Sequence, residues 1–444
     1  MCEPPDNRRG GEESLAAHPK QNHFVNFSQN KRAILHTLRY MHPNTSQIHT
    51  LSQYTPAAAF RAAQKEQMAV ALWRMPGQRE VQVLVDFSGK PSQGKLQIEE
   101  VGQGFAISPF VNTEGLATYF LQADWYFKSG DTLEIPDIKL LSKSKQSFFA
   151  SLRHFLSEEK QRTFDIPDKL PLLASSSLQA EAEAYKALVQ KAIDAIAQGA
   201  FRKVVTSRKQ IVDLEQPLPP TYIFERLCER YPQAFVSLFF LPEKGVWLGA
   251  SPEVLVSVNA AQEFWTMALA GTQAYQEGKS LAEAVWTQKE IEEQALVSRY
   301  IINCLKKIRV REFEDLGPRT VLAGNLLHLQ TDFLIDLRHL HYPQLPSVML
   351  DLLHPTSAVC GMPKAESLDF LLRHEGYERE FYSGYLGPVN IEAETHLFVN
   401  LRCMQWQPKQ LWLYAGGGIT IDSQPAKEWQ ETVMKCQTML QALQ

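Results

Sequence analysis

Ala415-Gly416-Gly417-Gly418-Ile419, followed by Asp422-Ser423-Gln424-Pro425, is the stretch around which the chain is organised. An apolar run, 411–414, leads into the three glycines, which allow the backbone to turn tightly and to approach a ligand closely. Ser423 is a suitable helix N-cap, and Pro425 suits a first helical turn. We therefore expect a strand, a glycine turn and then a helix.

The expected helix would carry Glu428, Glu431 and Lys435 at positions i, i+3 and i+7, close to one line along its surface. Two carboxylates and an ammonium group beside a glycine turn suit a metal ion and an anionic substrate. Taken alone, however, the segment is better explained as a C-terminal helix with a solvated charged edge. Other segments have to decide between the two interpretations.

The composition is that of a globular protein without a strongly charged partner. Of the 444 residues, 44% are hydrophobic and 21% charged, and the net charge of −4 gives no reason to expect nucleic acid or an anionic membrane as partner. No apolar run reaches the roughly 18 residues that a membrane span needs. The six cysteines are scattered without zinc or disulfide spacing, which indicates a reducing cytoplasm.

Strand-like segments come in runs with helices between the runs, a pattern that favours an α+β fold over regular βαβ alternation. We expect large, mostly antiparallel β-sheets packed as a sandwich with helices outside. Residues 1–21 are polar and predict a disordered leader. A Pro- and Ser-containing linker near 167–177 predicts a boundary between an N-terminal α+β part, 22–175, which completes the sheets, and a catalytic domain, 176–444.

A long helix is expected from about 280 to 308, and its periodicity places two acids on an apolar face. Glu290 and Glu293 fall on the same stripe as Val297 and Ile301. A carboxylate on a buried face has to be paired, protonated or bound to a cation, although a helix whose first half protrudes into water explains the pattern as well. Together with the two acids of the last helix, these oxygen ligands suit Mg²⁺.

Two further charged residues stand at positions where they could take part in catalysis. Lys203 lies in the apolar strand pattern 201–212, where a lysine ordinarily marks an edge or solvent-facing position. Were it buried, desolvation would favour the neutral amine, which can act as a general base. Glu253 follows a strand and a Ser-Pro bend. An acid there is ordinarily a turn residue, but beside a pocket it can stay protonated as a general acid.

Taken in order, these segments resemble the chorismate-utilising enzymes, the family that includes anthranilate synthase component I and the isochorismate, salicylate and aminodeoxychorismate synthases. The resemblance covers roughly 182–441. Each motif alone is unspecific, but the ordered set is specific. It consists of Lys203-Val204-Val205, Ser251-Pro252-Glu253, Leu269-Ala270-Gly271-Thr272, Lys289-Glu290-Ile291-Glu292-Glu293, His328-Leu329, Leu353-His354-Pro355-Thr356, Ala358-Val359-Cys360-Gly361, Phe381-Tyr382-Ser383-Gly384, Leu401-Arg402 and the closing glycine segment.

The resemblance implies a role for each candidate residue. Glu293 and Glu431 would bind Mg²⁺ directly, assisted by Glu290 and Glu428, and the metal would hold the ring carboxylate of chorismate. The groups that receive the substrate's carboxylates would be Tyr382, Arg402, Lys435 and the backbone of Gly416, Gly417 and Gly418. The groups that line the ring's pocket would be Gly271, Thr272 and His328.

The residue at position 203 selects the branch of the family. Members that add ammonia, or that cooperate with a glutaminase, typically carry Gln at this place, and members that add water carry Lys. The resemblance therefore implies a Mg²⁺-dependent, reversible isochorismate synthase. Lys203 would take a proton from water attacking C2 of chorismate, and Glu253 would donate one to the departing C4 hydroxyl. A salicylate synthase, which uses the same two residues and then eliminates pyruvate, is the alternative left open.

The resemblance also bears on pathway and partners. The 378–390 run favours menaquinone synthesis over a siderophore pathway, no glutaminase subunit is expected, and the chain would act as a monomer or homodimer in the cytoplasm. Lys203 argues against an aminating synthase, and the intact charged residues argue against a catalytically idle chorismate-binding module. There are three departures, one of which is Ser357, where the family often has a second Pro. Gln294 stands where the family often has His, and the 385–390 run is longer than usual and differs in composition.

Overall fold

The computed structural model describes residues 50–51, 55–112, 117–131, 133–134, 141–159, 178–275, 278–323, 326–441 and 443. All of them belong to one compact unit, Ile48–Gln444. The expected leader, 1–21, and the two expected domain boundaries, between 21 and 22 and between 175 and 176, lie outside the described residues.

The first of two large sheets has nine strands, and each neighbouring pair in it is antiparallel. In order across the sheet, the strands are β16 (Gly361–Met362), β9 (Lys203–Asp213), β20 (Gln410–Ile419), β19 (Cys403–Gln407), β11 (Gly245–Ser251), β10 (Phe235–Leu241), β2 (Ala69–Arg74), β3 (Val81–Asp86) and β7 (Trp125–Lys128).

The second sheet also has nine strands in antiparallel pairs. In order, they are β14 (Glu314–Ala323), β15 (Leu326–Asp336), β13 (Glu263–Ala274), β12 (Val254–Val258), β18 (Thr395–Val399), β17 (Tyr385–Val389), β5 (Gly104–Ser108), β6 (Thr118–Gln122) and β4 (Ser92–Gly94). Strands from the first part of the chain therefore end both sheets. A separate small sheet pairs β1 (Thr50–Leu51) with β8 (Leu133–Glu134).

The two large sheets pack face to face, as the sandwich prediction required. Phe235 of β10 stacks on Phe398 of β18, with ring centroids 4.1 Å apart and planes 5° from parallel. Trp247 of β11 and Phe105 of β5 are fully buried in the same apolar layer. Because these side chains come from both sheets, the layer between the sheets is one continuous core. The predicted α+β fold with antiparallel sheets is confirmed.

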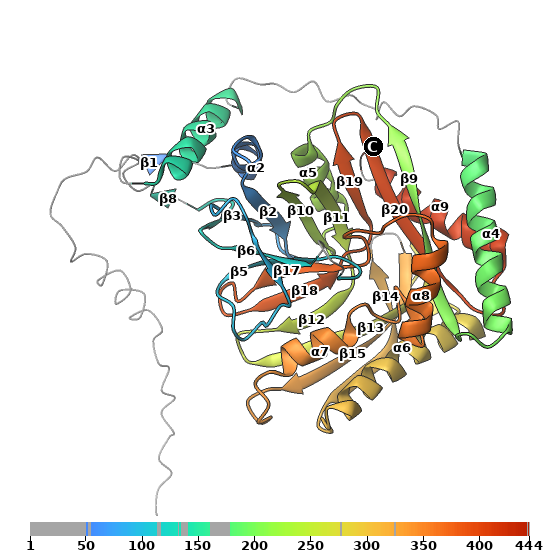
Figure 1. Cartoon of the computed structure of the whole chain (residues 1–444). Helices are drawn as coiled ribbons and strands as arrows, with labels where there is room; N and C mark the ends of the chain where they lie inside the picture. Colours follow the sequence, from blue (N-terminus) through green and yellow to red (C-terminus); the bar gives the residue numbers. More distant parts are fainter. Residues whose placement is uncertain are drawn as a thin grey trace, which may run out of the picture. The chain divides into compact units, whose positions relative to one another are not determined.

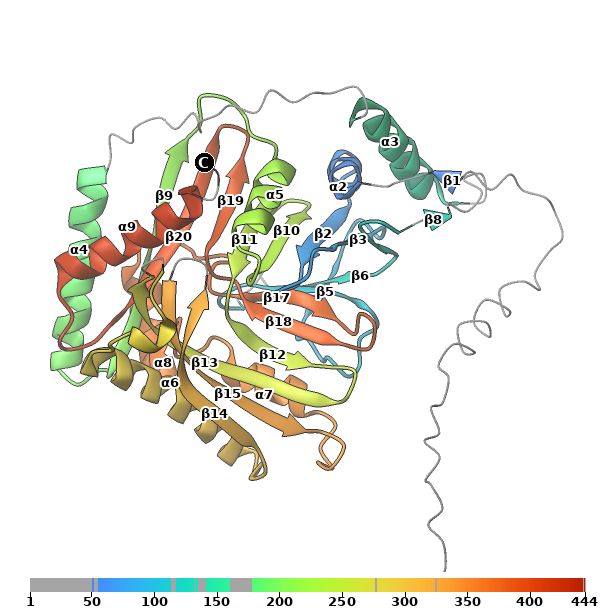
Figure 2. The same ribbon diagram turned by 180° about the vertical axis from the view of Figure 1, so that it is seen from behind.

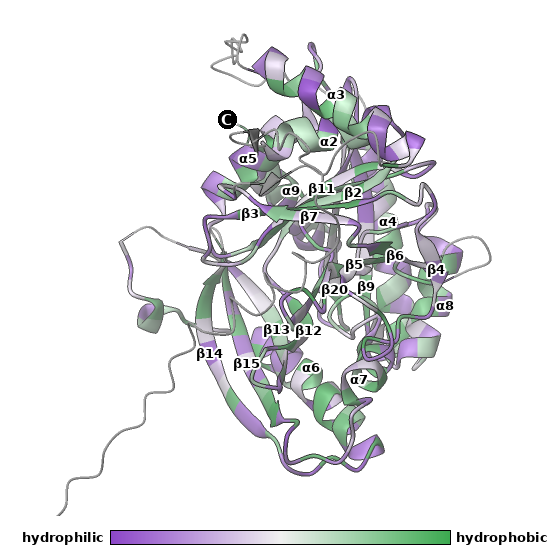
Figure 3. Ribbon diagram, turned by 90° about the vertical axis from the view of Figure 1, so that its left-hand side faces the viewer, coloured by the Kyte–Doolittle hydropathy of each residue, from purple (hydrophilic) through white to green (hydrophobic). Residues whose placement is uncertain are grey.

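Helices cover the outer faces of the sandwich (Figures 1 and 2). On the first sheet the apolar layer includes α2 (Pro56–Lys65), α3 (Lys143–Glu159), α5 (Pro220–Arg230) and the end of α9 (Pro425–Gln441). The other layer includes α4 (Leu178–Ala197), α6 (Gln288–Lys307), α7 (Leu345–Leu353) and α8 (Lys364–His374). Figure 3 shows hydrophilic and hydrophobic residues alternating along α3 and α6, as expected of helices with one buried face. None of the described helices is both long and apolar enough to cross a membrane.

The structure corrects the local prediction at the opening stretch. The three glycines do not turn, because they lie inside β20 and pair in register with β9, Gly416 opposite Ser207 and Gly418 opposite Val205. The helix does begin at Pro425, as predicted. The long helix, α6, starts later than expected, after a short 3-10 turn, η2 (Leu281–Glu283), and an extended segment.

Candidate active site

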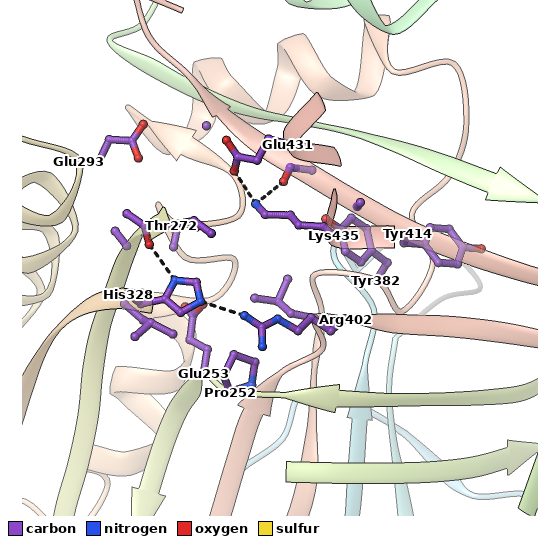
Figure 4. A pocket seen from close by; sticks show the side chains of 18 of the residues that line it. Pro252, Glu253, Thr272, Glu293, His328, Tyr382, Arg402, Tyr414, Glu431 and Lys435 are labelled. Carbon is purple, nitrogen blue, oxygen red and sulfur yellow. Dashed lines mark hydrogen bonds and ion pairs between the residues drawn. The ribbon is translucent and has the colours of Figure 1, made fainter. Parts of the chain in front are cut away.

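A cavity of about 140 Å³ lies between the two sheets near β9, β13 and β20 (Figure 4). Most of the candidate residues line it: Lys203, Glu253, Gly271, Thr272, Glu293, His328, Tyr382, Arg402, Gly416, Gly418, Glu431 and Lys435. Gly417, Glu290 and Glu428 are the candidates that do not. The ordered motifs, spread over more than half of the chain, therefore meet at one place.

Lys203 is the first residue of β9, and its side chain is buried although the strand lies next to the sheet edge. β16 covers β9 at this point by pairing Met362 with Lys203. On the other side, β20 presents Gly418, and a Cβ atom built there would lie 2.8 Å from Cε of Lys203. The absence of a side chain at Gly418 thus leaves the space in which the lysine lies. A solvated edge position for this lysine is wrong.

Glu253 lies in the connection between β11 and β12 and is 5% exposed. Burial raises the pKa of its carboxyl to about 8, although the nearby ammonium of Lys203 acts in the opposite direction. Glu253 is therefore mostly protonated at neutral pH and has a proton to donate. The cavity thus holds a buried lysine side chain and a buried carboxylic acid together.

His328 of β15 joins the second sheet to Arg402, which lies between β18 and β19. Its Nδ1 is 2.7 Å from the carbonyl oxygen of Gly271, and its Nε2 is 2.8 Å from Nη2 of Arg402. A carbonyl only accepts and a guanidinium only donates, so Nδ1 carries the proton and Nε2 accepts. Burial, together with Arg402, lowers the pKa of His328 to about 3, and burial lowers that of Arg402 to about 10. The imidazole is neutral and the guanidinium charged.

Lys435 of α9 and Gly416 of β20 line another part of the cavity. Lys435 Nζ donates to the carbonyl oxygen of Gly416 and to Oε1 of Glu431, both at 2.8 Å (Figure 4). A Cβ atom on Gly416 would lie 3.0 Å from the hydroxyl of Tyr382. The glycine therefore lets the tyrosine approach the strand closely. Gly417, one residue on, faces the other side of β20, as the alternation of a strand requires.

Three of the four predicted metal ligands lie close to this glycine backbone, two beside Gly417 and one beside Gly418. A Cβ atom on Gly417 would lie 3.4 Å from Oε2 of Glu428 and 3.9 Å from Cδ of Glu431, and one on Gly418 would lie 3.4 Å from Oε1 of Glu293. The glycines thus leave room for carboxylates from α6 and α9. Oxygen ligands of this kind fit Mg²⁺. Within the described residues, however, no three His, Cys, Asp or Glu side chains are grouped closely enough to hold an ion.

Three of the four acids have a cation or a hydrogen-bond donor beside them. Glu428 is buried and accepts a hydrogen bond from Nζ of Lys289 on α6 at 3.0 Å. Burial alone would raise the pKa of Glu431, but Lys435, followed by other ammonium groups, holds it below the ordinary value. The side chain of Glu290 accepts the backbone N–H of Thr287 at 2.7 Å and caps α6, so its assisting role at a metal stays a prediction.

Some residues of the site were not among the candidates. Lys289 links the two helices that carry the acids, and its only signal in the sequence is its place beside Glu290 in the motif. Leu401, Tyr414 and Ala415 line the cavity. They directly precede Arg402 and the glycine triplet, so adjacency to a motif was the only available indication.

A family model described as chorismate binding enzyme matches residues 122–444. The chain belongs to this family. The match includes every candidate residue of the site and the strands of both large sheets from β7 onward. The chorismate-binding enzyme fold is also found in the solved menaquinone-specific isochorismate synthase MenF of Escherichia coli, with a TM-score of 0.69 and 20% identity over 93% of this chain and 98% of that one.

The sequence relatives of this chorismate-binding enzyme include named isochorismate synthases. A salicylate biosynthesis isochorismate synthase of Pseudomonas aeruginosa is 34% identical over 273 residues, 59% of this chain and 55% of the relative. The isochorismate synthase EntC of Escherichia coli K12 is 27% identical over 298 residues, 65% of this chain and 75% of the relative. The chain thus spans about half the length of the first relative and three quarters of the second.

Proposed function

We propose that the chain is an isochorismate synthase, which converts chorismate reversibly to isochorismate. The observation that carries this proposal is that buried Lys203 and buried, protonated Glu253 line one cavity, which the guanidinium of Arg402 also lines. An amine and a carboxylic acid held out of bulk water are the base and the acid that replacement of one hydroxyl by another requires. The isochorismate synthases among the relatives support the same reaction.

In this mechanism the chain moves two protons. Lys203, in its amine form, takes a proton from the water that forms the new bond to C2 of the substrate. The ring double bonds shift, the C4–O bond breaks, and Glu253 gives its proton to the departing oxygen, which leaves as water. The substrate gains one water and loses one. The two side chains end as an ammonium and a carboxylate, so the reverse reaction uses them in exchanged roles.

The substrate carries two carboxylates, and the cavity offers separate groups for them. Arg402 lines the cavity, and its hydrogen bond from Nη2 to His328 orients a guanidinium of the kind that binds carboxylates. Tyr382 and the glycines Gly416 and Gly418 of β20 line the cavity as well, and the Tyr382 hydroxyl and the glycine backbone would receive the second carboxylate. Lys435, held by Glu431 and Gly416, keeps a positive charge between the acids and the substrate.

We include Mg²⁺ in the proposal. Glu293, Glu428 and Glu431 would hold it, with Glu290 assisting from the start of α6. Bound there, the ion would neutralise and orient the ring carboxylate of the substrate. Water addition without a glutaminase subunit follows from Lys203. Menaquinone synthesis is the pathway that we propose, on the strength of the 378–390 run, over a siderophore pathway.

Oxygen labelling tests the proposed reaction directly. Chorismate and Mg²⁺ are incubated with the chain in ¹⁸O-water, and isochorismate is isolated after less than one-tenth conversion, so that back-reaction is small. We expect one ¹⁸O atom in each isochorismate molecule, located at C2. Unlabelled isochorismate would mean that the hydroxyl migrates within the substrate, and the roles given to Lys203 and Glu253 would then be wrong.

A further inference from the structure

A buried ion pair takes the place of a neighbouring strand along part of β9. β16 pairs with β9 through only two residues. Farther along β9, Nη2 of Arg379 donates to the carbonyl oxygen of Val205 at 2.6 Å, and the backbone N–H of Ser207 donates to Oε1 of Glu375 at 2.7 Å. Side chains therefore satisfy backbone groups that a further strand would otherwise satisfy.

Glu375 and Arg379 are almost completely enclosed, with side chains 4% and 2% exposed. Arg379 Nε donates to Oε2 of Glu375 at 2.7 Å, and the hydroxyl of Ser207 donates to Oε1 at 2.8 Å. Since that hydroxyl has a single proton, the hydroxyl of Tyr377, 2.6 Å away, has to donate to Ser207. The carboxylate is thus surrounded by donors from β9 and from the 375–379 segment.

Both ends of this network lead into the cavity. On β9, Lys203 lies two residues before Val205, whose carbonyl the guanidinium holds. On the other side, the backbone N–H of Tyr382 donates to the carbonyl oxygen of Arg379 at 2.9 Å. Lys203 and Tyr382 both line the cavity. The ion pair therefore connects the strand of the proposed base to the segment of a proposed substrate ligand.

We propose that Glu375 and Arg379 are positioning residues, which hold β9 and the segment leading to Tyr382 in one arrangement and so align Lys203 for proton transfer. Burying two charges costs desolvation energy that an apolar pair would not cost, so stability alone does not account for them. Their directional bonds to two backbone groups of β9 explain why charged residues are present here. The kinetic part of this inference rests on the proposed function, whereas the anchoring of β9 does not.

The test compares Glu375→Gln with a matched variant, Asp86→Asn. In Glu375→Gln an amide group faces an N–H of Arg379, so one bond of the network is lost while size is kept. Asp86 is likewise buried and accepts backbone N–H groups of Ser88 and Gln122, but it lies on β3, far across the sheet. Amide hydrogen exchange of the 203–213 peptide is measured by mass spectrometry, and kcat and KM for chorismate are measured by steady-state kinetics. Both are measured at temperatures at which near-ultraviolet circular dichroism shows both variants to be folded.

We expect faster exchange of the 203–213 peptide in Glu375→Gln only, and a kcat about ten- to a hundredfold lower with KM changed less than threefold, as misplacement of a catalytic group predicts. Exchange equal to that of Asp86→Asn would overturn the anchoring. Faster exchange with an unchanged kcat would overturn the alignment of Lys203. If the unaltered chain does not turn over chorismate, the proposed function fails, and the exchange comparison still decides whether the ion pair anchors β9. Should Glu375→Gln not fold, Ser207→Ala takes its place with the same expectations, because it keeps the ion pair and removes the hydroxyl that bonds to Glu375 and to Tyr377.

Discussion

Gly418 provides the space that the side chain of Lys203 occupies. A Cβ atom on Gly418 would lie 2.8 Å from Cε and 3.3 Å from Nζ of the lysine, and the first distance is well below the separation of packed carbon atoms. The glycine is in an extended strand that pairs with β9, so its role is to admit a neighbour and not to form a turn. The position of the Lys203 side chain against β20 thus depends on the absence of a side chain at Gly418.

Gly418→Ala should therefore displace Lys203 and lower kcat for chorismate by about tenfold or more, because a small misplacement of a reacting group is costly. Steady-state kinetics measures the effect. Gly102→Ala is the control, since no atom lies within 4 Å of a Cβ built at that position. Equal kcat values for the two variants would show that the lysine tolerates the methyl group.

Lys203→Gln should abolish the formation of isochorismate, because an amide cannot take the proton from the attacking water. Product formation is followed by liquid chromatography and mass spectrometry. Lys209→Gln changes the same residue type on the same strand outside the cavity and should keep its rate within about twofold. Turnover of Lys203→Gln within about tenfold of the unaltered chain would exclude Lys203 as the base.

Glu253 should make the free energy of unfolding depend on pH in a defined direction. Its carboxyl ionises near its ordinary value of 4.5 in the unfolded chain, but burial raises the pKa to about 8 in the folded one. As the pH rises, the unfolded chain therefore loses this proton at a lower pH than the folded chain does. The free energy of unfolding falls for this reason between about pH 4.5 and about pH 8. Glu253→Gln cannot ionise and should gain stability relative to the unaltered chain across this range. Urea unfolding at several pH values measures the difference in the free energy of unfolding between Glu253→Gln and the unaltered chain. A difference that does not change with pH would contradict the raised pKa of Glu253.

Glu431→Gln should raise the Mg²⁺ concentration that gives half-maximal activity by about tenfold or more, because a ligand charge is removed. Isothermal titration with Mg²⁺ in the absence of substrate gives a second, independent measurement. Glu292→Gln, an exposed acid on α6 whose carboxylate bonds to Gln288, is the control and should leave both quantities unchanged. Unchanged Mg²⁺ binding in Glu431→Gln would remove this residue from the metal site.

The sequence allowed the sheets and the meeting of the motifs to be predicted, but not the details that make the site work. Runs of strand-like segments indicated antiparallel sheets because a parallel sheet would require a helix between successive strands. A glycine indicates only that many backbone conformations are allowed at its position, and the triplet was therefore expected to form a turn. Its extended form follows from the pairing of β20 with β9, which no local pattern encodes.

Burial of a charged residue is likewise decided by distant parts of the chain. Lys203 is covered because β16, which lies more than 150 residues later in the sequence, pairs with the start of β9. Lys289 finds Glu428 at a separation of 139 residues, and only the packing of α6 and α9 brings them together. These contacts depend on tertiary structure, so periodicity and spacing could not predict them.

The identity of the product tests the central claim most directly. The chain is incubated with chorismate and Mg²⁺ until the composition is constant, and again starting from isochorismate. The acids are separated by liquid chromatography and identified by mass spectrometry, and pyruvate is assayed in the same samples. We predict the same mixture of chorismate and isochorismate from both directions, with no pyruvate. Salicylate together with an equal amount of pyruvate would contradict the assignment as an isochorismate synthase.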